Sequence, residues 1–187
     1  QVAASIQVST QGRQLYDIST QVAAHVKRSG LQTGLLTLYI QHTSASLLIN
    51  ENYDQDVLVD MEAFFNRLVP DGDPLFVHTV EGPDDMPAHI RSALTQTHLA
   101  IPVLNGQLAL GTWQGVFLYE HRHAPGQRTV LVHILGGKPA IITIGRRTIA
   151  FNSQQLEASA YNDWTELYRP VQPDRQLKPG IIFKRFD

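Results

Sequence analysis

Cysteine is absent from the 187-residue sequence. Its absence excludes disulfide bonds, zinc sites with thiolate ligands and cysteine nucleophiles, and it favours a cytoplasmic protein. Candidate metal ligands and catalytic groups are therefore sought among the 8 histidines and the 17 aspartates and glutamates.

The sequence also lacks long apolar runs and an excess of positive charge. No run approaches the length of a membrane span, so no membrane segment is expected. The 15 Lys and Arg are outnumbered by 17 Asp and Glu, and this balance argues against a general nucleic-acid-binding protein. The 43% hydrophobic and 17% charged content is typical of a soluble globular protein with one domain, or one domain and an appendage.

Charge is unevenly distributed along the chain. Residues 51–85 contain ten acidic residues and a single basic one, Arg67, whereas residues 122–187 contain ten Lys or Arg and five acids. An acidic surface repels a bare phosphate, so a phosphorylated substrate bound there would need a divalent cation or a nearby arginine. Arg91 and Arg122 are the local candidates. The alternative is two oppositely charged faces that only assist solubility or subunit contact.

Hydrophobic periodicity predicts an α+β protein. The dipeptide Asn105-Gly106 is typical of a hairpin turn, and Gly30 is typical of the end of a helix. The expected helices are residues 18–30, 54–68 and 86–96. The expected strands are residues 2–8, 35–40, 46–50, 99–103, 107–111, 113–121 and 128–135.

Gly136-Gly137 is the expected domain boundary, which gives a domain of residues 1–136 and an extension of residues 137–187. The extension is predicted to contain a hairpin formed by residues 140–144 and 148–151, a helix over 153–168 and an extended arm. It is too apolar for a disordered tail, so we expect it to pack on its own subunit or on a neighbouring one.

The segment EGPDDMPAHIR, residues 81–91, combines helix-start signals with two carboxylates and an imidazole. Asp84 or Asp85 can cap the helix, and Pro87 is tolerated in its first turn. Asp85 and His89 lie four residues apart and are therefore neighbours on one helical turn. A neutral histidine beside an ionised aspartate suits metal binding or proton transfer. The other interpretation is an ordinary capped helix with a surface histidine.

Two further segments are rich in polar groups next to predicted core strands. HTSASLLINEN begins at His42, and its buried polar groups predict either an internal hydrogen-bond network or the wall of a site. LGTWQGVFLYEHR ends with Glu120-His121 at the end of a strand, where both residues are ligand or acid–base candidates. The other interpretation of this pair is a polar strand terminus.

The three segments together, in this order and spacing, closely resemble the YjbQ family, also described as secondary thiamine-phosphate synthases. The resemblance runs from the N-terminus to about Gly136. It implies a compact α+β domain with three short helices around a barrel-like, mainly antiparallel sheet, assembled as a homotrimer with sites near the subunit interfaces. It also implies a weak ability to join a pyrimidine diphosphate to a thiazole phosphate with release of pyrophosphate. The catalytic residues it implies are Asp85 and His89.

The preferred hypothesis is a metal-assisted enzyme acting on a small phosphorylated molecule. His42, His89 and His121 could form a zinc site with an open position, or Asp84, Asp85 and Glu51 could gather magnesium. Alternatives are a metal-dependent hydrolase using the same residues and a non-enzymatic trimeric ligand-binding protein. His25, His78, His123 and His133 are expected to be structural or at the surface. The residues expected to bind substrate are Asn50, Glu51, Arg91, Trp113, Gln114, Glu120 and Arg122.

Overall fold

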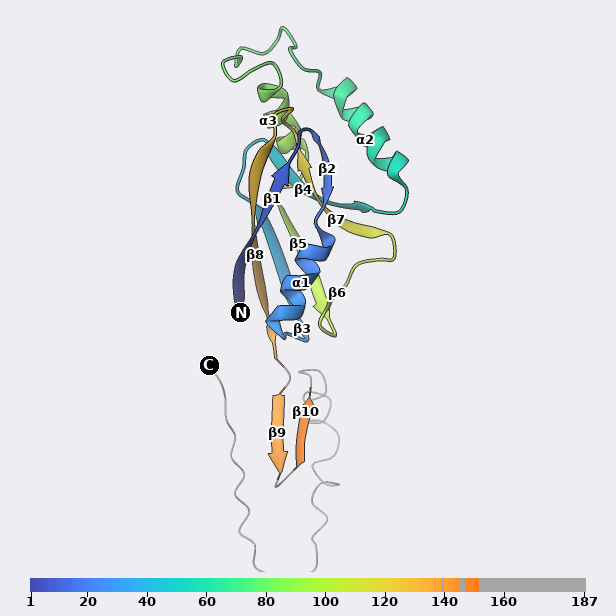
Figure 1. Ribbon diagram of the computed structural model, residues 1–187, viewed down its shortest axis with the longest axis vertical. Coiled ribbons are helices and arrows are strands. Elements are labelled where there is room, and N and C mark those ends of the chain that lie inside the picture. The colour runs from blue at the N-terminus through green and yellow to red at the C-terminus, as the bar shows by residue number, and fades with distance from the viewer. Residues whose placement is uncertain (139, 145–146, 152–187) are drawn as a thin grey trace, which may run out of the picture. The chain divides into compact units, whose positions relative to one another are not determined.

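The structure is a computed structural model that describes residues 1–138, 140–144 and 147–151 (Figure 1). The chain divides into two compact units, Gln1–Gly136 and Gly137–Asp187. In the second unit, β9 (Ala140–Ile144) and β10 (Arg147–Phe151) pair antiparallel, as the hairpin prediction requires. The predicted helix over 153–168 and the extended arm lie outside the described residues.

The first unit contains two sheets, and every strand pair with a described register is antiparallel. The strands curl into a half-barrel, which confirms the predicted α+β class. In order, the larger sheet contains β1 (Val2–Thr10), β8 (Gly126–Gly137), β3 (Thr33–Ile40), β5 (His98–Leu104) and β6 (Gln107–Leu108). The smaller sheet contains β2 (Gln14–Asp17), β7 (Gln114–Glu120) and β4 (Ala45–Glu51).

Three helices connect these strands, close to the predicted ranges. α1 (Ser19–Ser29) ends at Gly30, whose φ of 68° is the left-handed conformation that glycine adopts without a steric penalty. α2 (Gln55–Leu68) begins after Asp54, whose side chain accepts a hydrogen bond from the Asp56 N–H. α3 is Asp85–Leu94. No helix among the described residues combines the length and apolar character needed to cross a membrane.

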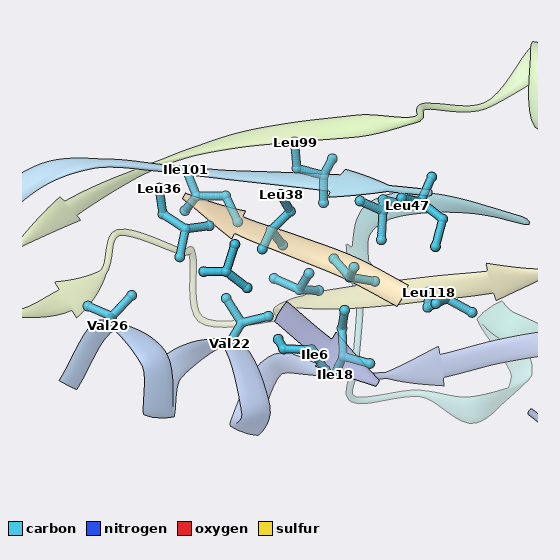
Figure 2. Packing of buried hydrophobic residues seen from close by; sticks show 14 of the residues in the cluster. Ile6, Ile18, Val22, Val26, Leu36, Leu38, Leu47, Leu99, Ile101 and Leu118 are labelled. Atoms are coloured by element: carbon cyan, nitrogen blue, oxygen red, sulfur yellow. The ribbon is translucent and has the colours of Figure 1, made fainter. Parts of the chain in front are cut away.

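The hydrophobic core lies between the two sheets and is closed by α1 (Figure 2). Burial alternates along β5, as its hydrophobic periodicity predicts. Leu99, Ile101 and Val103 point into the core, and their neighbours in the strand are exposed. Val22 and Val26 of α1 pack against this core from the helix side. Each fully buried side chain of this size contributes about 1.5–3 kcal/mol, so the sheets and α1 form one stable frame.

β7 is buried on both of its faces, unlike the strands at the sheet edges. Val116 and Leu118 join the hydrophobic core, whereas Tyr119 packs on its other face against Phe65 of α2. The Tyr119 hydroxyl donates to Glu62 of α2 at 2.5 Å. The end of β7 therefore lies between the apolar core and a polar layer beneath α2 and α3.

Candidate functional site

Three chain segments meet at a cavity of about 360 Å³. They are the loop between β3 and β4, the start of α3, and the connection from β7 to β8. Ala45 of β4 pairs with Glu120 of β7, so the antiparallel register places the start of one strand beside the end of the other. The charged and imidazole side chains that line the cavity are those of His42, Glu81, Asp85, His89, Arg122 and Arg128, and all but Arg128 belong to the segments singled out in the sequence.

Asp85 is the central residue of this cavity. It is the first residue of α3, and its side chain is only 2% exposed. Its Oδ2 atom lies 2.8 Å from Nε2 of His78 and 3.4 Å from Nε2 of His89. In the part of the chain that the structure describes, these three side chains form the group whose ligand atoms lie close enough together to hold a metal ion.

A backbone carbonyl orients the His89 ring. His89 Nδ1 lies 3.1 Å from the Thr43 carbonyl oxygen, which can only accept a hydrogen bond, so Nδ1 must carry the proton. In a neutral imidazole the other nitrogen, Nε2, is then a bare lone pair, and it faces the Asp85 carboxylate. Two acceptors in this position repel each other unless a proton or a metal ion lies between them. A ring N–H donated to a carbonyl is also the usual arrangement of a metal-binding histidine, so the trio fits a metal ion.

His42 has the opposite tautomer. Its Nδ1 accepts a hydrogen bond from the Ser44 N–H at 3.0 Å, so the ring proton of the neutral form is on Nε2. Burial lowers the pKa of His42, and the nearby Arg128 charge lowers it further. His42 is therefore a neutral hydrogen-bond donor at the cavity wall.

Arg122 fixes the start of α3 to the end of β7. Its guanidinium donates to Asp84 Oδ2 at 3.0 Å, to Asp85 Oδ1 and to the Glu81 carbonyl oxygen at 2.7 Å. Asp85 thus has one oxygen engaged by Arg122, while Oδ2 faces the two histidines.

Asp84 occupies the N-cap position, but the predicted capping hydrogen bond does not form. Its carboxylate accepts hydrogen bonds from Arg122 and from the His123 N–H instead. Burial alone would raise the pKa of Asp84, but these hydrogen bonds outweigh burial and hold the pKa below its ordinary value. Asp84 is therefore a charged anchor for the loop that follows β7.

Glu120 lies directly behind the cavity and is fully buried. One oxygen accepts hydrogen bonds from the backbone N–H groups of His121 and Arg122. The other accepts from the Thr10 hydroxyl and forms an ion pair with Arg128 at 2.7 Å. Both oxygens are occupied, so Glu120 positions the two arginines at the cavity and is itself closed to a ligand.

The structure brings together a different trio from the predicted His42, His89 and His121. His121 is completely buried, with Nε2 2.9 Å from the Ser46 hydroxyl and its ring 4.3 Å from that of Tyr119. Burial, and then the charges of Arg91 and Arg13, lower the pKa of His121 to about 3. A side chain at the end of a strand can point into the protein as readily as toward solvent, and the sequence pattern does not distinguish these two orientations.

Several predicted binding residues lie at the far end of the smaller sheet. Glu51 pairs with Gln114, whereas Ala45 pairs with Glu120 beside the cavity. Six residues of extended strand separate these two ends, a distance of about 20 Å. The residues placed away from the cavity by this register are Asn50, Glu51, Trp113 and Gln114. The predicted magnesium set of Asp84, Asp85 and Glu51 is therefore not brought together either.

Arg91 is also remote from the cavity, although it is in α3. It is fully buried and donates to Glu62 and Asn66 of α2. Its position six residues after Asp85 turns it to a different side of the helix.

His78 is the site residue that sequence reasoning missed. It was expected to be structural, but the loop between α2 and α3 carries it to the Asp85 carboxylate. Its position in a long loop beside the most polar motif was the only available signal, since loops often carry functional groups.

Comparisons with known proteins agree with this architecture. The family described as UPF0047 protein YjbQ-like matches residues 4–137. A UPF0047 protein from Synechocystis is 55% identical over 129 residues, which cover 69% of this chain and 88% of the relative. UPF0047 protein YjbQ from Escherichia coli O157:H7 is 50% identical over 103 residues, covering 55% of this chain and 74% of the relative.

Solved structures show the same fold. A hypothetical protein from Aeropyrum pernix has a TM-score of 0.68 at 30% identity, with 73% of this chain and all of that chain covered. A YbjQ-like protein of unknown function from Sulfolobus solfataricus has a TM-score of 0.67 at 26% identity, covering 73% of this chain and 97% of that chain. The similarity therefore spans the first compact unit.

Proposed function

The chain belongs to the UPF0047 YjbQ-like family, and from this membership and the cavity we propose a metal-assisted enzyme that acts on small phosphorylated molecules. The observation that supports this most strongly is that Nε2 of His78 and Nε2 of His89 both face the Asp85 carboxylate, while the Thr43 carbonyl orients the His89 ring. These three residues would hold a divalent ion, zinc or magnesium. When bound, the ion neutralises negative charge that develops on a departing phosphate.

The charges around the cavity also favour a divalent ion. Four carboxylates lie in the cavity or directly behind it, those of Glu81, Asp84, Asp85 and Glu120. Two guanidiniums, of Arg122 and Arg128, oppose them. The four negative and two positive charges leave a net charge of −2. A phosphorylated substrate is therefore repelled until two further positive charges are present.

The chain's own residues would orient the reactants. Arg122 fixes the Asp85 carboxylate through Oδ1, and the Thr43 carbonyl fixes the His89 ring. The Nε2–H of His42 can donate to an oxygen of a bound phosphate. Side chains held by fixed partners reorganise little when charge develops, which is the main advantage of such a site.

The specific reaction in this proposal is weak thiamine-phosphate synthesis. The carbon–oxygen bond between the pyrimidine methylene and its diphosphate breaks, and pyrophosphate leaves with the bonding electrons. The nitrogen of the thiazole phosphate supplies the electron pair of the new carbon–nitrogen bond. The alternative is hydrolysis of a phosphorylated substrate by the same residues, with water in place of the thiazole.

Assembly as a homotrimer is part of the same proposal. α2 has no buried residue, and Val59, Phe64 and Leu68 on it are more than half exposed. In the following loop, Val77 and Val80 are 98% and 92% exposed. Exposed apolar groups of this extent are typical of a surface covered by another subunit. Sedimentation equilibrium would give the mass of three chains, and a monomer mass would contradict the trimer.

Metal content tests the site directly. The chain is loaded with zinc, freed of excess ion and analysed by mass spectrometry of the elements. The wild type is expected to retain one ion per chain, and His89→Ala and His78→Ala are expected to lose it because each variant removes a ligand. His42→Ala and His121→Ala are expected to retain it, which separates this trio from the one predicted from sequence. His25→Ala, on α1, is the control. Unchanged metal in folded His89→Ala would contradict the site.

The reaction is tested by mixing the pyrimidine diphosphate with the thiazole phosphate. Product is expected from the wild type and from the His25→Ala control, and is expected to be lost in Asp85→Ala and His89→Ala. Folded variants that form product at the parental rate would end the assignment of these two residues to catalysis. Phosphate release without coupled product would favour the hydrolase.

A further inference from the structure

We propose that Arg128 and His42 form an oxyanion subsite on the wall of the cavity, suited to the phosphoryl group of a substrate. The subsite deepens the proposed function and rests on it for the identity of the substrate class. Neither donor belongs to the metal-binding trio of His78, Asp85 and His89, and neither takes part in the hydrogen bonds of Arg122.

Arg128 is held in a fixed position with part of its guanidinium still available. Its Nε lies 2.7 Å from Glu120 Oε2, and its side chain is only 11% exposed. NH1 donates to the Gln127 carbonyl oxygen at 3.2 Å. Among the described residues, NH2 has no hydrogen-bond partner, and Arg128 lines the cavity. A guanidinium with unengaged N–H groups in a fixed orientation is the usual protein group for binding a phosphate.

His42 supplies the second donor. The Ser44 N–H occupies its Nδ1, so the proton of the neutral ring is on Nε2. His42 and Arg128 line the same cavity, and burial together with the Arg128 charge lowers the pKa of His42. A neutral N–H donor beside a guanidinium adds a hydrogen bond without adding charge.

Gly126 makes room for the Arg128 guanidinium. A Cβ atom at position 126 would lie 2.7 Å from Arg128 NH1 and 3.0 Å from its central carbon. The Gly126 backbone is held beside Thr10 of β1 by the strand register, and its N–H donates to the Thr10 hydroxyl oxygen at 3.1 Å. An added methyl group would therefore displace the guanidinium rather than the strand. Gly126 does not have a positive φ, so alanine is compatible with the backbone.

The net charge of −2 around the cavity makes binding of an anion and a divalent cation interdependent. Arg128 is compensated by Glu120 and Arg122 by two aspartates, so a phosphate alone enters an acidic environment. Zinc bound to His78, Asp85 and His89 would bring the sum of these charges to zero. We therefore expect phosphate to bind more tightly to the zinc-loaded chain than to the metal-free chain.

Calorimetric titration with inorganic phosphate tests the subsite. The chain is loaded with one zinc ion per chain and desalted, so that no free zinc can precipitate the phosphate. Arg128→Gln is expected to weaken phosphate binding by about tenfold or more, since a charge-assisted hydrogen bond is lost, while the zinc content stays unchanged. Gly126→Ala is expected to weaken binding in the same direction while keeping Arg128. Arg67→Gln, an exposed arginine of α2, is the matched control and is expected to bind like the wild type.

The outcomes separate this proposal from the proposed function. Wild-type binding by both Arg128→Gln and His42→Ala, or no phosphate binding by the zinc-loaded wild type, would overturn the subsite and leave the metal site standing. A chain that retains no zinc would overturn the proposed function. Phosphate binding by that metal-free chain would still support the subsite if Arg128→Gln abolished it. An equal affinity for phosphate in the zinc-loaded and metal-free chains would contradict the expectation that phosphate and zinc strengthen each other's binding.

Discussion

The polar groups on the two sides of α3 differ in whether their hydrogen-bond partners lie within the protein. On one side, Arg91 is fully buried and donates to Glu62 and Asn66 of α2. On the other, Asp85 and His89 line an open cavity. The interior network mainly pairs protein groups with each other, whereas in the cavity His89 Nε2 and the Asp85 carboxylate lie close enough together to share a metal ion.

This difference separates structural polar residues from candidate functional ones. A buried group paired within the protein stabilises the fold and cannot bind a ligand without breaking that pairing. Ligand atoms that face each other across a cavity contribute little to stability, and their arrangement becomes favourable when a metal ion binds. Substitutions on the two sides should therefore differ in their effect on unfolding, from large at Arg91 to very small at His89.

Arg91→Met is expected to have the largest effect on stability. It removes a buried guanidinium and leaves Glu62 and Asn66 without their partner, so the free energy of unfolding should fall by about 3 kcal/mol. Urea denaturation measures the change. Arg67→Met on the exposed face of α2 is the control and should stay within about 0.5 kcal/mol of the wild type. Equal effects of the two substitutions would show that the interior network does not stabilise the fold.

Acidification should have an intermediate effect through His121. Its pKa is about 3 in the folded chain, because burial and then the charges of Arg91 and Arg13 disfavour the imidazolium, against an ordinary value of 6.5. The unfolded chain takes up the proton first as the pH falls below 6.5, so this contribution to stability is complete above that pH and is lost between pH 6.5 and 3. At pH 5 the loss should be about 2 kcal/mol.

Urea denaturation of the wild type and of His121→Gln at neutral and acidic pH isolates this contribution. The glutamine variant cannot take up the proton in either state. Its stability should therefore fall less than that of the wild type between pH 6.5 and 5. Parallel decreases in the two proteins would mean that His121 is not held neutral by the fold.

His89→Ala should have the smallest effect on the metal-free chain. The His89 side chain is 34% exposed, so the free energy of unfolding should change by less than about 0.5 kcal/mol. Added zinc should raise the melting temperature of the wild type, because the ion binds only the folded chain, and should leave His89→Ala unchanged. An equal rise in both proteins would contradict the role of His89 as a ligand.

The sequence predicted those parts of the fold and the site that depend on local geometry. The helices, most strands and the Asn105-Gly106 turn follow from periodicity and turn chemistry, and β2 was missed because it has only four residues. Asp85 and His89 were correctly expected to be neighbours, because residues four apart on a helix always are.

The missed features depend on long-range arrangement. The register between β4 and β7 decides that Glu51 lies far from Asp85, and no local pattern fixes that register. The same holds for His121, which follows β7 and is buried against Tyr119 and the Ser46 hydroxyl. His78 reaches the Asp85 carboxylate through a loop that also carries the Arg13–Asp71 ion pair.

The Thr43 carbonyl and the Ser44 N–H belong to the same peptide group. Its oxygen accepts the proton of His89 Nδ1, and its nitrogen donates to His42 Nδ1. Because the two bonds of a trans peptide point in opposite directions, this single plane polarises the cavity, with a proton donor at one histidine and an electron-pair donor at the other. Rotating that plane by half a turn would exchange the two roles together, so the orientation of one amide decides which ring nitrogen of each histidine carries the proton.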